Sequence, residues 1–102
     1  MKIAVASEGK VADSIVSSVS GRAPYYLIFE NGKLVKTIKN PFRIGGGGAG
    51  FGIADMLSDE GVELVVSGRF GGNMVGALDS KNMKHEEVSG ISVEEALEKF
   101  SS

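Results

Sequence analysis

Short apolar runs alternate with segments of helical periodicity throughout the second half of this chain. The apolar runs span 62–67 and, more weakly, 83–88, and apolar residues recur at helical spacing over 53–57, 74–78 and 93–100. Strands that alternate with helices pair in parallel, because each helix returns the chain to the same edge of the sheet by a right-handed crossover. The alternation therefore predicts an α/β fold.

A β-hairpin is predicted in the first half of the chain, at Asn31-Gly32. These two residues separate the apolar runs 25–30 and 33–39, and a two-residue Asn-Gly connection is typical of a tight hairpin turn. The run 1–6 is apolar without alternation, which indicates a central strand buried on both faces. If that first strand runs up, the hairpin runs down and then up, and the later strands run up.

Local signals indicate where the helices begin and end. Ser92 and Glu95 have the spacing of a capping box at the start of the last helix, and Asn73 is the expected cap of the helix before it. Gly61 is placed to end the first helix. With 102 residues the chain has the usual size of one domain, so we expect 1–102 to form a single domain.

The predicted topology brings four connections together beyond the carboxyl ends of the parallel strands. They are 7–22, 40–52, 67–72 and the turn at Ser89-Gly90. Open α/β sheets bind their ligands in the crevice at that edge. Glycine is also concentrated here, since the chain has 15 glycines, about twice the average usage, and many lie in two of these loops.

A glycine-rich loop that leads into a helix can bind an anion. It presents unpaired backbone N–H groups at the positive end of the helix dipole, and glycine lets the anion approach the backbone closely. Three arginines add positive charge at the same edge. The predicted anion or cofactor site consists of Gly21, Arg22, Arg43, Gly46, Gly47, Gly48, Gly50, Gly68, Arg69, Gly71 and Asn73. The alternative is that the glycines only permit tight turns and the arginines are solvated.

Composition excludes several other classes of function. Eleven basic and thirteen acidic side chains leave a net charge of −2, so nucleic acid is not an expected partner. Cysteine is absent, which excludes thiolate metal ligands and disulfides and agrees with a cytoplasmic location. No apolar run approaches about 20 residues, and the first residues look like a strand, so we expect neither a membrane protein nor an exported one.

Catalytic and nucleotide-binding motifs are not evident. His85 is the only imidazole, and no serine lies in a G-x-S-x-G motif, so we expect the protein not to be an enzyme. Gly45, Gly47 and Gly50 match G-x-G-x-x-G, but no strand directly precedes them as a dinucleotide site requires. Gly9-Lys10 and Gly32-Lys33 lack the following hydroxyl residue of a P-loop.

Ordered motifs along nearly the whole chain resemble the dinitrogenase iron-molybdenum cofactor biosynthesis family. They are Gly21-Arg22-Ala23-Pro24-Tyr25-Tyr26, then Asn40-Pro41 with Gly47-Gly48-Ala49-Gly50, then Val65-Val66-Ser67-Gly68-Arg69 with Gly71 and Asn73. The resemblance implies a ribonuclease H-like fold, with a mixed five-stranded sheet, helices on both faces and no nuclease site. It also implies carriage of an iron-sulfur or iron-molybdenum cofactor, or its precursor, and cofactor-assembly proteins as partners.

The chain departs from the family pattern in its soft metal ligands. Relatives often have histidine and phenylalanine where this chain has Val19-Ser20, and often a histidine in the glycine loop. A cluster would then be held by backbone N–H groups and the three arginines instead of by coordination. The alternative function is a protein-interaction or regulatory module that has lost cofactor binding. Its candidate contacts are Phe42, Phe51 and Phe70.

Overall fold

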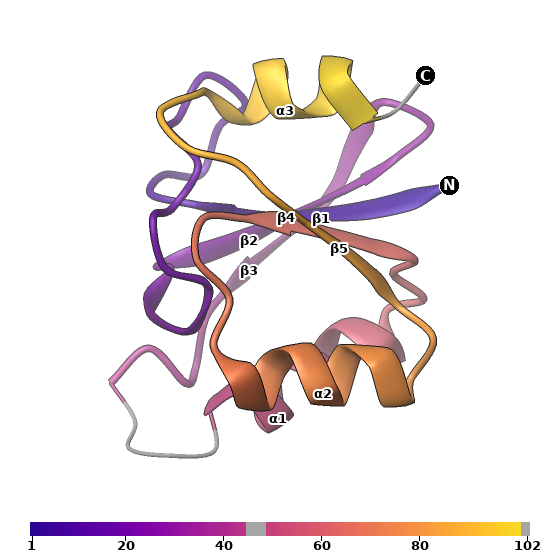
Figure 1. Cartoon of the computed structure of the whole chain (residues 1–102). Coiled ribbons are helices and arrows are strands. Elements are labelled where there is room, and N and C mark those ends of the chain that lie inside the picture. The colour runs from indigo at the N-terminus through magenta and orange to yellow at the C-terminus, as the bar shows by residue number, and fades with distance from the viewer. Residues whose placement is uncertain (45–48, 101–102) are drawn as a thin grey trace.

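A five-stranded sheet with helices on both of its faces forms the part of the chain that the computed structural model describes, residues 1–44 and 49–100 (Figure 1). The strand order is β3-β2-β1-β4-β5. In chain order the elements are β1 (Lys2–Ser7), the short 3-10 helix η1 (Ser20–Arg22), β2 (Tyr25–Glu30), β3 (Lys33–Lys39), α1 (Ala49–Asp59), β4 (Leu64–Ser67), α2 (Gly72–Ser80), β5 (Lys84–Glu87) and α3 (Val93–Phe100).

The strand directions confirm the prediction of a mixed sheet. The β1–β4 and β4–β5 pairs are parallel, and β2 is antiparallel to both of its neighbours. The β2–β3 hairpin turns at Asn31-Gly32, where both residues have positive φ, as this type of turn requires. The more specific assignment to the ribonuclease H-like class stays a prediction.

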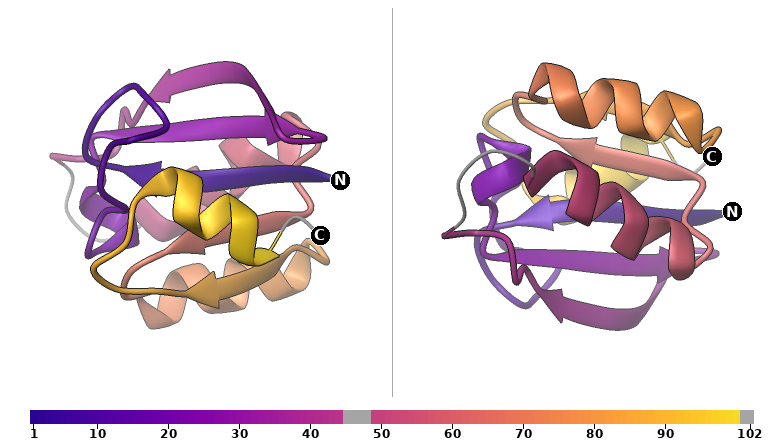
Figure 2. Two further views of the ribbon diagram at one scale, coloured as in Figure 1. Left: turned by 90° about the horizontal axis from the view of Figure 1, so that it is seen from above. Right: turned by 90° about the horizontal axis from the view of Figure 1, so that it is seen from below.

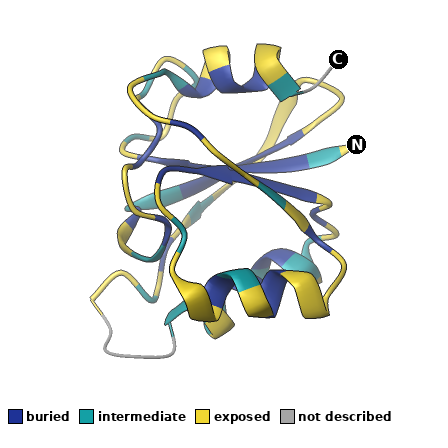
Figure 3. Ribbon diagram, in the orientation of Figure 1, coloured by how far each residue is buried: buried dark blue, intermediate teal, exposed yellow. Residues whose placement is uncertain are grey.

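Each face of the sheet has its own hydrophobic core. Ala4 and Ala6 of β1 belong to the core under α1 and α2, whereas Ile3 and Val5 belong to the core under α3. This two-sided burial explains why β1 is apolar without alternation. In Figure 3 the central strands are mostly buried, while β3, whose residues are nearly all exposed, forms one edge of the sheet.

The last helix and the end of the first follow the local sequence signals. Ser92 Oγ accepts a hydrogen bond from the Glu95 N–H (3.1 Å), and Glu95 Oε1 accepts one from the Ser92 N–H (3.0 Å), which confirms the capping box. Gly61 has a φ of +78° just after α1, which confirms its role in ending that helix.

Asn73 is not a helix cap, so that prediction was wrong. The structure begins α2 at Gly72 and places Gly71 at the N-cap, with extended backbone angles (φ −71°, ψ 155°). The Gly71 carbonyl already accepts the hydrogen bond from the Val75 N–H (3.1 Å), so Asn73 lies in the first turn of the helix, where it is exposed. Among the described residues, no helix is both long and apolar enough to span a lipid bilayer.

Candidate functional site at the carboxyl edge of the sheet

The connections that follow β1, β3, β4 and β5 lie together at one end of the sheet, as the topology predicted (Figure 1). The carboxyl ends of the parallel strands β1, β4 and β5 form this end of the sheet. Both views in Figure 2 place η1 there as well. The edge is where an open α/β sheet binds ligands.

Backbone hydrogen bonds join the two loops that carry Arg22 and Arg69. The Ser20 N–H donates to the Arg69 carbonyl (2.9 Å), and the Arg69 N–H donates to the Ser18 carbonyl (2.7 Å). Val19 and Arg69 form an isolated parallel bridge. The loop before η1 therefore runs beside the exit of β4, and the two arginines, both exposed, belong to one loop cluster.

Gly68 permits this close approach of the two loops. A Cβ at Gly68 would lie 2.6 Å from Ser18 Cα and closer still to the Ser18 carbonyl oxygen. Gly21 and Gly71 differ, because a Cβ at either would meet no atom within 4 Å and neither has a positive φ. Packing therefore explains the glycine at 68 but not those at 21 and 71, where the backbone is open to a ligand.

Asn40 fastens the loop after β3 to η1. Its side-chain Nδ2 donates to the carbonyls of Ala23 (2.9 Å) and Gly21 (3.3 Å), and its Oδ1 accepts from the Phe42 N–H (2.9 Å). Asn40 itself is 4% exposed. Arg43, three residues further on and exposed, thus follows directly from a segment that is fixed against the Arg22 loop. In the sequence, Asn40 was notable only as part of the Asn40-Pro41 family motif.

Tyr26, in the buried strand β2, fixes η1 through a hydrogen bond. Its ring is fully buried, and its hydroxyl donates to the Ser20 carbonyl (2.7 Å). Burial raises the pKa of the Tyr26 phenol well above its ordinary value, because the charged phenolate is disfavoured away from water. The hydroxyl therefore remains a donor at any physiological pH. This role could not be predicted from the sequence, because a tyrosine in an apolar strand gives no sign of its hydrogen-bond partner.

Gly50 lies inside α1, so the structure gives it a packing role. A Cβ at Gly50 would lie 2.8 Å from the Met74 backbone nitrogen, at the contact between α1 and α2. Glycine at this position lets the two helices approach closely. The other predicted glycines of this loop, Gly46, Gly47 and Gly48, lie outside the described residues.

The substitution Gly50→Ala should therefore destabilise the protein by about 1–3 kcal/mol, because the added methyl forces α1 away from the α2 backbone. Gly76→Ala is the matched control, since it is also helical but has open space around it. That substitution should stabilise by about 0.5–1 kcal/mol. Urea unfolding measures both changes, and equal effects of the two substitutions would contradict the packing role.

The described side chains do not supply a donor set for direct metal coordination. No group of three or more His, Cys, Asp or Glu within residues 1–44 and 49–100 could hold a metal ion, and the chain has no cysteine. His85 packs edge-on against Phe70, with ring centroids 5.0 Å apart. A ligand at this edge would be held by hydrogen bonds and charge, which suits an anion.

Two buried hydroxyl groups at this edge have no hydrogen-bond partner within the part of the chain that the structure describes. They are Ser20 Oγ, in η1, and Ser67 Oγ, at the end of β4. The site predicted from the sequence included their neighbours Gly21 and Gly68 but neither serine. For Ser67, the sequence signal that could have indicated a special role is its place as a polar residue at the end of the apolar run 62–67.

A mixed α/β sheet with arginine-bearing loops at its carboxyl edge is the architecture of many small ligand-binding domains. The chain belongs to the dinitrogenase iron-molybdenum cofactor family, whose model matches residues 1–102. This confirms the resemblance inferred from the motifs.

Two solved structures resemble the fold closely. The apo form of the orange protein from Desulfovibrio gigas has a TM-score of 0.91 and 25% sequence identity, over 98% of this chain and 86% of that protein. A Thermotoga protein of the DUF35 family, named as a candidate NifB protein, has a TM-score of 0.85 and 28% identity over the same shares of the two chains. No curated protein matches the sequence.

Proposed function

We propose that this protein is a small, non-catalytic carrier of an anionic iron-molybdenum or iron-sulfur cluster, or of its precursor, during cofactor assembly in the cytoplasm. The observation that supports this most is the joining of the Arg22 and Arg69 loops, through the Ser20–Arg69 hydrogen bond, beside the N-terminus of α2. Membership of the iron-molybdenum cofactor family points to this class of ligand, and the description of the similar orange protein as an apo form fits a protein that carries a ligand.

The cluster is held as cargo, without protein ligands to its metals. Guanidinium groups of Arg22, Arg43 and Arg69 provide charge, and none of them takes part in an ion pair among residues 1–44 and 49–100. The exposed first turn of α2, at Gly71 and Gly72, provides backbone N–H groups at the positive end of the helix dipole. Sulfide at the cluster surface accepts hydrogen bonds from both kinds of donor.

Retention of cluster metal should fall strongly when both arginines of the joined loops are removed. The protein is incubated anaerobically with an iron-molybdenum cofactor extract and separated by gel filtration, and iron and molybdenum in the protein peak are measured. We expect metal to co-elute with the wild type and to fall about tenfold or more in Arg22→Ala/Arg69→Ala, since each charge-assisted contact contributes about 1.5–3 kcal/mol.

The control removes the same amount of charge from the opposite end of the sheet. Lys33 and Lys84 begin strands β3 and β5 and are exposed, so Lys33→Ala/Lys84→Ala should retain as much metal as the wild type. Equal loss in the two double variants would show that only net charge matters. A wild-type peak without metal would rule out the carrier function.

An interaction module that does not bind a cofactor is the second candidate. Of its three predicted contact residues, Phe42 and Phe70 pack against the core, whereas Phe51 is 52% exposed. Ile44 is 98% exposed, so two large apolar side chains are uncovered in the segments that flank residues 45–48. If the wild type takes up no metal, a stable complex that is lost in Phe51→Ser would favour this function.

A further inference from the structure

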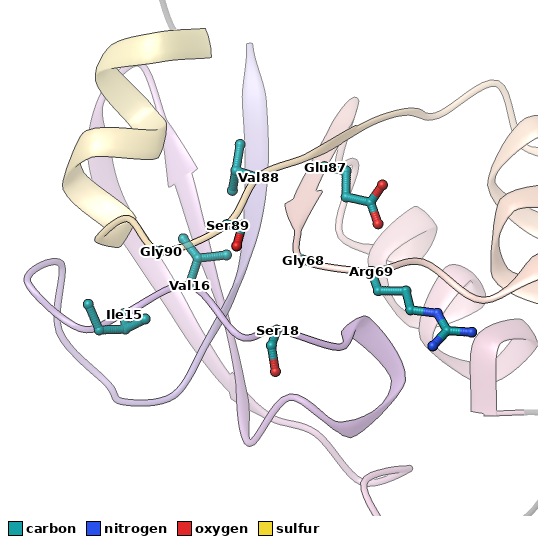
Figure 4. A pocket seen from close by; sticks show the side chains of 9 residues that line it. All are labelled: Ile15, Val16, Ser18, Gly68, Arg69, Glu87, Val88, Ser89 and Gly90. Atoms are coloured by element: carbon teal, nitrogen blue, oxygen red, sulfur yellow. The ribbon is translucent and has the colours of Figure 1, made fainter.

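A pocket of about 530 Å³ opens at the carboxyl ends of β4 and β5, beside the joined arginine loops (Figure 4). It lies between segment 15–18, Gly68-Arg69 and segment 87–90. Its volume is within the range of about 300–1000 Å³ that is usual for small-molecule sites. Of the residues that line this pocket, the predicted anion site included only Gly68 and Arg69.

Two side chains of opposite charge line the pocket without pairing with each other. Arg69 and Glu87 come from neighbouring strands, since Ser67 at the end of β4 is the register partner of Glu87 in β5. Both are exposed, and neither takes part in an ion pair within 4.0 Å among the described residues. In Figure 4 both charged groups lie on the same side of the pocket.

The opposite side of the pocket is apolar. Ile15, Val16 and Val88 form it, as Figure 4 shows. Val16 and Val88 are buried parts of the core under α3, so this wall is firmly supported, whereas the Ile15 side chain is 52% exposed. The pocket therefore presents a cation and a carboxylate opposite an aliphatic wall of which Ile15 is the exposed part.

We propose that this pocket binds a small zwitterion with an aliphatic substituent, that is, an α-amino acid such as leucine. The guanidinium of Arg69 binds the carboxylate of the ligand, for which its planar pair of donors is well matched. The Glu87 carboxylate accepts hydrogen bonds from the ammonium group, and the aliphatic side chain packs on Ile15, the exposed residue of the apolar wall. A simple anion would be repelled by Glu87 and a simple cation by Arg69.

This binding goes beyond the proposed carrier function and does not depend on it. The two sites share Gly68 and Arg69, but Arg22 does not line the pocket and Glu87 does not belong to the predicted anion site. Glu87→Gln therefore tests the amino-acid pocket alone, and Arg22→Ala tests the cluster site alone. If one proposal fails, the other still has its own readout.

Titration with L-leucine, followed by amide NMR, tests the proposal. We expect shifts at residues 15–18 and 87–90, which line the pocket, and saturation at millimolar ligand. Two analogues that each lack one charge, 4-methylpentanoate and isoamylamine, should bind about tenfold more weakly or worse, because one charged group of the pocket is then left without its partner.

Single substitutions test which side chain of the pocket binds each charged group of the ligand. Glu87→Gln should abolish the preference for leucine over 4-methylpentanoate, and Arg69→Ala should weaken both ligands. Glu86→Gln is the matched control, since Glu86 is also exposed on β5 but does not line the pocket, and Arg22→Ala should leave leucine binding unchanged. The proposal is overturned if leucine causes no shifts, if 4-methylpentanoate binds the wild type equally well, or if Glu86→Gln and Glu87→Gln have the same effect.

Discussion

Gly68→Ala should destabilise the protein by about 3 kcal/mol, a large part of the total stability of a domain of this size. The added Cβ would overlap the backbone of Ser18, with its Cα at 2.6 Å, and a backbone segment cannot rotate away as a flexible side chain can. To make room, the loop must leave β4, which breaks the hydrogen bonds from the Gly68 N–H to the Ser17 carbonyl (2.8 Å) and from the Arg69 N–H to the Ser18 carbonyl (2.7 Å).

Urea unfolding of Gly68→Ala and of Gly21→Ala provides the measurement and its control. Gly21 lies in the same loop cluster, but a Cβ there would meet no atom within 4 Å, so its substitution should change the free energy of unfolding by less than about 0.5 kcal/mol. If the two variants unfold alike, the close approach of the loops is not a feature of the folded protein. A Gly68→Ala variant that is too unstable to purify agrees with the prediction only if Gly21→Ala can be purified and unfolds in urea like the wild type.

Features with a local signal were predictable from the sequence. Asn31-Gly32 specifies its turn by positive φ, and Ser92 and Glu95 bond to each other across a single helical turn. The unbroken apolar run of β1 indicated burial on both faces, and strand–helix alternation then fixed the parallel pairs and the edge where the loops gather. From these few patterns the fold class could be inferred, together with the end of the sheet where the loops gather and the candidate site lies.

Features that depend on contacts between distant segments could not be predicted. Gly21 and Gly68 are each followed by an arginine, yet only Gly68 lies against another backbone, and that contact is with a loop about 50 residues away in the sequence. No local pattern marks Glu87 as a binding residue, because only the β4–β5 register places it near Arg69. Asn73 looked like a cap because the sequence does not show where the helix takes its first hydrogen bond.

Asn40→Ala should destabilise the protein by about 3 kcal/mol through hydrogen bonds alone. The side chain of Asn40 is the donor to the carbonyls of Gly21 and Ala23 and the acceptor for the Phe42 N–H, and it is almost completely buried. A buried polar group that loses its partner costs about 1–3 kcal/mol, and alanine leaves up to three such groups unpaired, some of which water can reach. Urea unfolding measures the loss, and Asn73→Ala, on the exposed first turn of α2, should change stability by less than about 0.5 kcal/mol.

Asn40→Asp separates the donor role of this side chain from its size. Aspartate has nearly the same shape and can still accept the Phe42 N–H, but its ionised carboxylate would face the two carbonyls that now receive the amide N–H groups. We therefore expect it to be at least as destabilising as alanine at neutral pH, whereas a side chain that only fills space would tolerate the change. Hydrogen exchange at 20–23 should accelerate in both variants, because Asn40 and Tyr26 are the two side chains that fasten η1 and only Tyr26 would remain. If exchange there stays at the wild-type rate while global stability falls, then Asn40 supports the fold without holding the Arg22 loop in place.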